Sequence, residues 1–128
     1  MSTSERYQRG AEMMKEVYGD LVPAAPEGAN AFMDVMVSQV FAEVWSRDGL
    51  SIRDRRLLVM GVIAASGEPS VWGIQARAAL LNDELDADQL REAVIQLAQY
   101  AGYPKVSGLV AATEQAIADM EKRKAGES

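Results

Sequence analysis

Helical periodicity with sharp end signals runs through the middle of this chain, from Leu50 to Thr113. Apolar residues recur there at three- and four-residue spacing, which places them on one face of an α-helix. Proline, glycine and capping residues interrupt the pattern. No stretch alternates apolar and polar residues as a half-buried strand would. This region therefore predicts four consecutive helices, and the whole chain an all-α bundle of about six.

Local signals set the bounds of the expected helices. The expected features, in order, are a helix carrying Tyr7 and ending near Gly19, a helix over residues 29–45, a helix capped by Ser51 and stopped at Gly67, a helix over residues 69–81, a helix capped by Asp86 and Gln89 and ended by Gly102, and a helix from Pro104 with a frayed charged tail from Glu121.

The third and fourth of these helices carry more apolar surface than a small bundle can bury. Residues 57–65 are apolar on nearly every side, which predicts a central helix covered by its neighbours. The fourth helix has Val71 and Ile74 on one side and Trp72 and Ala76 on another. We therefore expect a homo-oligomer, with a tightly wrapped monomer as the alternative.

Length and composition exclude several classes of protein. A chain of 128 residues with 48% hydrophobic residues suits a single domain over residues 1–128. Its net charge of -6 argues against a nucleic-acid partner, which requires a basic surface. No run reaches the roughly 18 apolar residues of a membrane span, so we expect no membrane partner. The N-terminal segment lacks the apolar core of a signal peptide, and a cytoplasmic location is expected.

The chain has no cysteine and no histidine. This absence excludes thiol nucleophiles and imidazole bases, and it removes the two commonest soft metal ligands, so no metal site is predicted. Any chemistry must rest on Arg, Glu, Asp, Gln, Tyr and Trp.

Several short motifs together resemble the carboxymuconolactone decarboxylase family. The most specific are the Trp-x-Arg-x-Gly-Leu turn at residues 45–50 and the Tyr-Ala-Gly-x-Pro helix junction at residues 100–104. Arg55 with Leu57, residues 78–80 and residues 90–92 follow the same pattern and spacing. The resemblance extends over roughly residues 40–118.

The resemblance implies an all-α bundle of the alkylhydroperoxidase D-like type that assembles as trimers or hexamers, with pockets near subunit contacts. In one branch the enzyme decarboxylates a carboxylated muconolactone in aromatic-acid breakdown, without metal or organic cofactor. The other branch performs disulfide and peroxide chemistry with a Cys-x-x-Cys pair, a Glu and a His. Thiol peroxidase activity is excluded here because the chain has no cysteine.

The chain departs from the decarboxylase branch within the segment that contains Arg77. A histidine usually stands two residues before an arginine of the motif, whereas this chain has Gln75 before Arg77. Acidic residues of the preceding turn are replaced by Ser70 and Val71. Glutamine orients a substrate by donating and accepting hydrogen bonds, but it does not exchange protons near neutral pH as imidazole does.

Gln75, Arg77 and Glu43 are the candidate catalytic residues. Gln75 lies on a face expected to be buried, where an amide either lines a pocket or only satisfies hydrogen bonds of the core. Arg77 either binds a substrate carboxylate or pairs across the bundle with an acid such as Glu43 or Glu92. A buried Glu43 could serve as general acid or base, and an exposed Glu43 would be solvated.

Arg55, Trp45, Tyr100 and Tyr103 are the candidate substrate-binding residues. Arg55 belongs to a basic cluster that either attracts an anionic ligand or is solvated. Trp45 either packs in a core or interface, or forms a pocket wall. The two tyrosines flank a helix junction and either pack there or line a pocket, where an unperturbed phenol is a weak acid.

Three functions remain open on these grounds. The first is a cofactor-free enzyme that acts on a small carboxylated lactone or enol acid, with Arg55 or Arg77 binding the carboxylate. The second is a catalytically silent homologue that binds a small acid or only assembles. The third is a module that binds another protein through the apolar fourth helix. Fold membership favours the first.

Overall fold

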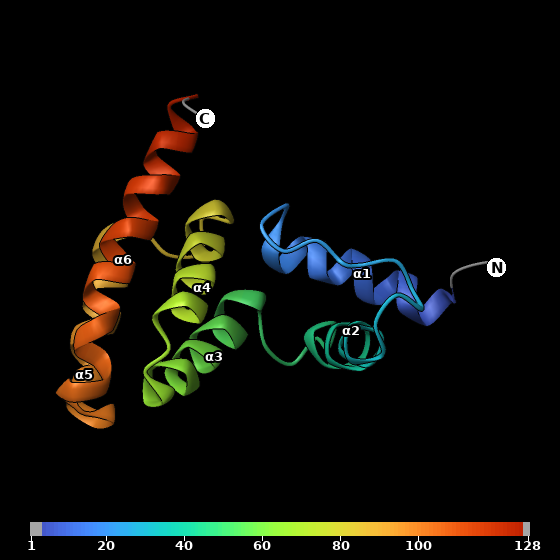
Figure 1. Cartoon of the computed structure of the whole chain (residues 1–128), viewed down its shortest axis with the longest axis horizontal. Coiled ribbons are helices and arrows are strands. Elements are labelled where there is room, and N and C mark those ends of the chain that lie inside the picture. The colour runs from blue at the N-terminus through green and yellow to red at the C-terminus, as the bar shows by residue number, and fades with distance from the viewer. Residues whose placement is uncertain (1–3, 127–128) are drawn as a thin grey trace. The chain divides into compact units, whose positions relative to one another are not determined.

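The structure is a computed structural model that describes residues 4–126. These residues form six α-helices and one π-helical segment, and no strand occurs among them, so the prediction of an all-α fold is confirmed (Figure 1). The elements are α1 (Glu5–Tyr18), α2 (Ala31–Val35), η1 (Met36–Trp45), α3 (Ile52–Ser66), α4 (Pro69–Leu81), α5 (Ala87–Ala101) and α6 (Tyr103–Lys124).

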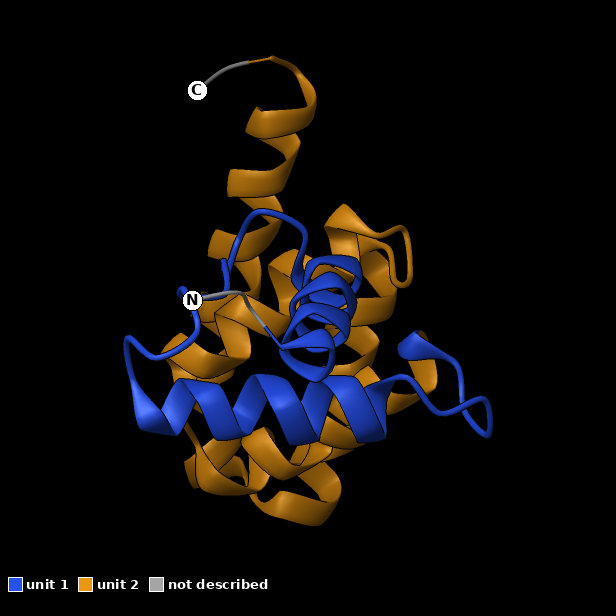
Figure 2. Cartoon of the chain, turned by 90° about the vertical axis from the view of Figure 1, so that its right-hand side faces the viewer, with its two compact units in different colours: residues 1–52 blue, residues 53–128 orange. Residues whose placement is uncertain are grey.

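Internal packing divides the chain into two compact units, residues 1–52 and residues 53–128, which Figure 2 colours separately. The first contains α1, α2 and η1, and the second contains nearly all of α3 together with α4, α5 and α6. The expectation of a single domain over the whole chain remains a prediction.

In the first unit, α1 packs against η1. Ser4 caps α1, because its side chain accepts a hydrogen bond from the backbone N–H of Tyr7. Gly10 allows the close approach of the two helices, since a Cβ at this position would lie 2.7 Å from the carbonyl carbon of Val37. Phe41 on η1 stacks on Trp45 with ring centroids 6.0 Å apart.

The helix expected over residues 29–45 is present in a different form. Asn30 caps the short α2, and from Met36 the chain continues as a π-helix up to Trp45. A π-helix closes its hydrogen bonds over five residues in place of four, so its turns are wider. An apolar residue at every third or fourth position indicates a helix but does not distinguish these two forms.

The second unit has its own apolar core, to which α3, α4, α5 and α6 all contribute. Trp72 of α4 is fully buried at its centre, and α6 packs against both α4 and α5. The buried cluster consists of Met60, Ile63, Ala64, Trp72, Ala76, Ala79, Leu85, Leu90, Val94, Ala98, Val106, Leu109, Ala116 and Ile117.

Most of the local end signals in this unit are confirmed. Asp86 and Gln89 form the predicted capping box at the start of α5. Gly102, with φ of 98°, separates α5 from α6. The expected fraying from Glu121 is wrong, because α6 continues to Lys124, and its last turn holds basic residues that suit the negative end of the helix.

Several apolar side chains of the second unit remain exposed. Leu58 and Val62 on α3 are 62% and 72% exposed, so the prediction of a central helix covered on all sides is wrong. Val71 and Ile74 on α4 are also partly exposed. Among the described residues, no helix combines the length and apolar character needed to cross a membrane.

Candidate functional site

A buried charged network connects α3, α4 and the loop that follows α4. The side chain of Arg56 is fully buried, and its Nε and Nη2 donate to the two carboxylate oxygens of Glu84, the Nη2–Oε2 distance being 3.1 Å. Arg56 Nη1 donates to Gln75 Oε1 at 2.8 Å. Gln75 is 4% exposed and the side chain of Glu84 is 9% exposed. The predicted candidate Gln75 therefore belongs to a network that is almost entirely removed from water.

The end of α4 fixes the position of Glu84. Asp83 takes a left-handed conformation with φ of 54°, and its N–H donates to the carbonyl of Leu80. The N–H of Glu84 donates to the carbonyl of Ala79, which completes a Schellman motif. The carbonyl of Glu84 accepts from Arg53 Nε at 2.9 Å. Glu84 thus leaves the helix with its backbone held on both sides.

Arg56 and Glu84 were not among the predicted site residues. The sequence does contain a signal for Arg56, since it precedes Met60 by four residues and Ile63 by seven, on the face of α3 that is buried. A charged residue on such a face must find a partner, because an isolated buried charge is very costly. No comparable signal identifies Glu84, whose contact with Arg56 depends on how the helices pack.

Arg77 lies on α4 but pairs away from this network. Its Nη2 donates to Asp119 Oδ2 on α6 at 2.6 Å. Arg77 therefore forms an ion pair with an acid of another helix, as one of the two alternatives expected, but the partner is Asp119 and not Glu43 or Glu92. Gly73, one turn earlier, leaves space that the guanidinium of Arg77 occupies. The hydrogen bond from Arg77, followed by one from Gln115, lowers the pKa of Asp119.

Two predicted residues, Glu43 and Trp45, lie on η1 in the first unit. The carboxylate of Glu43 is about half exposed and contacts Arg6 at 3.0 Å and Arg9 at 3.3 Å, so the buried environment considered for it is absent. Trp45 is buried and stacked on Phe41, which fits the packing interpretation. Their roles in a site remain a prediction.

The remaining candidates lie in the second unit. Tyr100 is 85% exposed near the end of α5, and Tyr103 is 61% exposed at the start of α6, where its hydroxyl accepts from Gln99 Nε2. Arg55 is partly buried on α3, next to Arg56. Exposure of both tyrosines means that these rings contribute little to the core of this chain.

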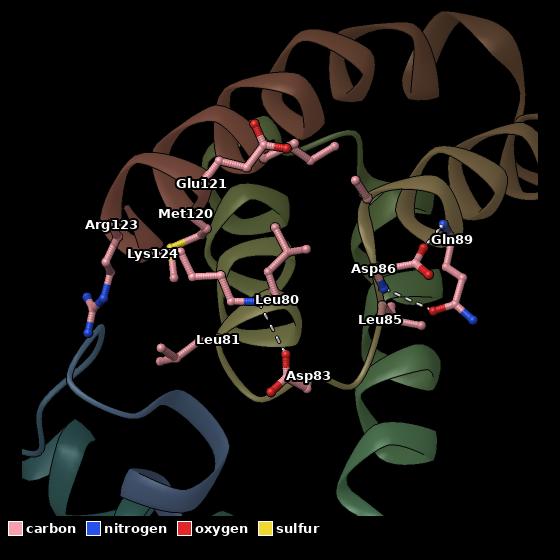
Figure 3. A pocket seen from close by; sticks show the side chains of 12 residues that line it. Leu80, Leu81, Asp83, Leu85, Asp86, Gln89, Met120, Glu121, Arg123 and Lys124 are labelled. Atoms are coloured by element: carbon pink, nitrogen blue, oxygen red, sulfur yellow. Dashed lines mark hydrogen bonds and ion pairs between the residues drawn. The ribbon is translucent and has the colours of Figure 1, made fainter. Parts of the chain in front are cut away.

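A surface pocket with a volume of about 520 Å³ lies at the C-terminal end of α4 (Figure 3). Leu80, Leu85 and Met120 contribute apolar surface, and an ion pair between Lys124 and Asp83 lies beside it. A second pocket lies in the first unit, beside Tyr7. In the part of the chain that the structure describes, none of the seven predicted site residues lines either pocket.

Within residues 4–126, no three Asp or Glu side chains come close enough together to hold a metal ion. The charged groups of the Arg56 network are instead satisfied by one another.

Comparison with known proteins assigns the fold to a family. The model of the carboxymuconolactone decarboxylase family matches residues 30–115. The chain belongs to this family. The resemblance seen in the sequence is thereby confirmed, and Gln75 with its network lies within the matched region.

Two curated relatives cover most of the chain. A 4-carboxymuconolactone decarboxylase of Acinetobacter baylyi is 29% identical over 125 residues, which is 94% of this chain and 92% of the relative. A nitrosuccinic acid decarboxylase of Metarhizium robertsii is 29% identical over 119 residues, which is 89% of this chain and 82% of the relative. Both names describe decarboxylases, and they support a carboxymuconolactone decarboxylase-like function at the level of the family.

The chemistry available to the Arg56 network follows from its three side chains. Arginine offers fixed donors to a carboxylate, and the amide of Gln75 both donates and accepts hydrogen bonds. In the network these groups meet one acidic group, Glu84. The arrangement can orient an acid and stabilise negative charge, and Glu84 is its one group able to accept or release a proton.

Proposed function

We propose that this protein is a cofactor-free decarboxylase that acts on a small carboxylated lactone or enol acid. The observation that carries this proposal is the fully buried Arg56, which is joined to Gln75 at the position where a histidine usually stands in the family that the chain resembles. A buried ion pair is weak evidence for stability, since apolar residues often replace one without loss. Charged groups held out of water are instead frequent in sites that bind or transform anions.

The chemistry requires an electron acceptor within the substrate. When a C–CO₂⁻ bond breaks, CO₂ leaves and the electron pair stays on the carbon, so a neighbouring group must take it. The acids mentioned in the names of both relatives contain such a group. Carboxymuconolactone has a lactone carbonyl, and nitrosuccinic acid has a nitro group. The resulting enolate or nitronate then takes up a proton. Positive charge and amide donors stabilise this anion without a metal or organic cofactor.

The candidate residues take the following roles in this proposal. Gln75 orients the substrate and the developing anion, while Arg55 and Arg77 supply positive charge near the α3 and α4 surfaces. Glu43, Trp45, Tyr100 and Tyr103 are proposed to reach a substrate only in an assembled oligomer, because each lies outside the Arg56 network.

Assembly and location are further parts of the proposal. The exposed apolar residues of α3 support a homo-oligomer, for which the family resemblance suggests a trimer or hexamer. The proposal also includes one domain over residues 1–128, a cytoplasmic location and a role in the breakdown of aromatic acids. Nucleic acid is not among the proposed partners, because the net charge is -6.

Incubation of the purified protein with carboxylated lactones and with nitro- and oxo-acids tests the function. We expect substrate loss accompanied by an equal amount of CO₂. The variant Gln75→Ala should lower kcat, whereas Gln96→Ala, which removes an exposed amide from α5, should leave it unchanged. Equal rates in the wild type and in buffer, for all of these acids, would contradict the proposal.

A catalytically silent homologue that binds small acids or other partners is the second candidate. The pairing of Arg77 with Asp119 favours it, because a substrate carboxylate would have to displace Asp119 before Arg77 could bind it. A thermal-shift screen against small carboxylates distinguishes the two. A ligand that stabilises the protein, by about 2.7 kcal/mol at one hundred times its Kd, and is recovered intact would support this second function.

A further inference from the structure

We propose that Arg56 binds the carboxylate of the substrate, and that Glu84 occupies this carboxylate site when no substrate is bound. The ligand class is a small carboxylic acid. This inference rests on the proposed function, because it names the residue through which the proposed site binds an acid.

The geometry of the pair supports this assignment. Arg56 contacts both oxygens of Glu84, one from Nε and the other from Nη2. This two-pronged arrangement is the one by which arginine binds free carboxylates. A bound acid with the same orientation would satisfy the same donors. Glu84 is thus a chemical equivalent of the ligand, supplied by the chain itself.

Gln75 holds the guanidinium in place. Its Oε1 accepts from Arg56 Nη1 at 2.8 Å, which fixes the amide beside the guanidinium. Nε and Nη2 of Arg56 are the donors that contact the carboxylate of Glu84. A bound carboxylate would take these same two donors.

Displacement of Glu84 requires a movement of its side chain, which also breaks the hydrogen bond that Asn82 Nδ2 donates to Glu84 Oε2 at 3.2 Å. Its N–H is bound to the carbonyl of Ala79 and its carbonyl to Arg53, so the backbone is anchored while the side chain has rotatable bonds. The side chain of Glu84 is 9% exposed and that of Arg56 has no exposure, so the carboxylate is the partner nearer to solvent. A ligand can therefore reach the guanidinium once Glu84 rotates away.

Calorimetric titration with succinate, with neutral succinamide as the matched ligand control, tests the inference. We expect Glu84→Gln to bind succinate about tenfold more tightly than the wild type, because the neutral amide competes less well for Arg56. Asp83→Asn is the matched variant, since it removes the same charge from the same loop and asparagine tolerates the left-handed conformation. It should bind like the wild type. Adding Arg56→Lys to Glu84→Gln should abolish the gain, and succinamide should bind to none of these proteins.

Unchanged succinate affinity in Glu84→Gln, or an equal gain in Asp83→Asn, would overturn the inference. If Glu84→Gln does not fold, Glu84→Asp decides, because it keeps the charge but withdraws the carboxylate by one methylene. That variant should bind succinate measurably more tightly than the wild type, and unchanged binding overturns the inference. If the wild type decarboxylates an acid but Glu84→Gln does not bind succinate more tightly, the proposed function stands and this inference fails. If Glu84→Gln binds succinate more tightly but the wild type decarboxylates none of the acids, this inference stands and the proposed function fails.

Discussion

At the scale of single residues, the second unit depends on a few polar groups that meet inside or beside its apolar core. Trp72 is fully buried, and its indole N–H donates to Thr113 Oγ1 at 2.8 Å. Thr113 in turn donates to the carbonyl of Leu109. One hydroxyl therefore satisfies both the buried indole and the backbone of α6, and each such group is costly to leave without a partner.

Replacement of Thr113 by valine tests this arrangement. Valine has nearly the same shape but no hydroxyl, so the indole N–H of Trp72 would lose its acceptor. We expect Thr113→Val to lower the free energy of unfolding by about 1–3 kcal/mol, measured by urea denaturation. Thr113→Ser keeps the hydroxyl and should lose less. A serine variant as unstable as the valine variant would assign the effect to packing of the methyl group.

The ion pair between Arg77 and Asp119 should make stability depend on pH. Hydrogen bonds from Arg77 and Gln115 lower the pKa of Asp119 below its ordinary value of 3.8. The unfolded chain therefore takes up this proton at a higher pH than the folded chain. The stabilisation is fully present above the ordinary pKa and is lost as the pH falls through the lowered value. Asp119→Asn should be less stable than the wild type at pH 7.

The difference between the two proteins should shrink as the pH falls from 5 to 3, measured as the urea midpoint at each pH. Combining Asp119→Asn with Arg77→Met serves as the control, because the two losses should not add when both residues act through the same contact. A difference that stays constant over this pH range would contradict the role given to Asp119.

At the scale of elements, the local end signals were predictable from the sequence and the tertiary contacts were not. The capping box of Asp86 and Gln89 requires only residues three positions apart, so the start of α5 was predicted correctly. The partner of Arg77 lies 42 positions away on α6, and no spacing rule indicates it. Gln75 was found through the family pattern, whereas Glu84 depends on the packing of α3 against the end of α4.

Helix contact in the first unit depends on one glycine. Gly10 is buried on α1, and a Cβ there would lie 2.7 Å from the carbonyl carbon of Val37 on η1. Gly10→Ala should raise the helix propensity of α1 by about 1 kcal/mol. We nevertheless expect it to destabilise the protein by about 1–3 kcal/mol, because α1 and η1 must move apart.

Thermal unfolding followed by circular dichroism measures this effect. Gly49→Ala is the matched control, since a Cβ at Gly49 would have no atom within 4 Å. It should unfold close to the wild-type temperature. A Gly10→Ala protein at least as stable as the wild type would show that the α1–η1 contact is not as close as the structure gives it.

At the scale of the whole molecule, exposed apolar residues on α3 support the proposed assembly. Leu58 and Val62 lie one turn apart on α3 and are 62% and 72% exposed. The proposed homo-oligomer would bury these two side chains at a subunit contact. Arg56 lies on the same helix, two residues before Leu58. A subunit contact through Leu58 and Val62 would therefore involve the helix that carries the proposed site.

Val62→Glu tests whether this face of α3 joins subunits. A carboxylate buried at a subunit contact without a partner is strongly unfavourable, so we expect the wild type to sediment as an oligomer and the variant as a monomer. Because Val62 is exposed in the single chain, the helical circular dichroism of the Val62→Glu protein should match that of the wild type. This measurement separates loss of assembly from loss of folding. Gln96→Glu, which places the same charge on an exposed position of α5, should leave the mass of the assembly unchanged.

A monomeric wild type would remove the assembly from the proposal, and an oligomeric Val62→Glu would place the contact on another face. If assembly completes the site, the monomeric variant should also lose decarboxylation, although the Arg56 network lies within one chain.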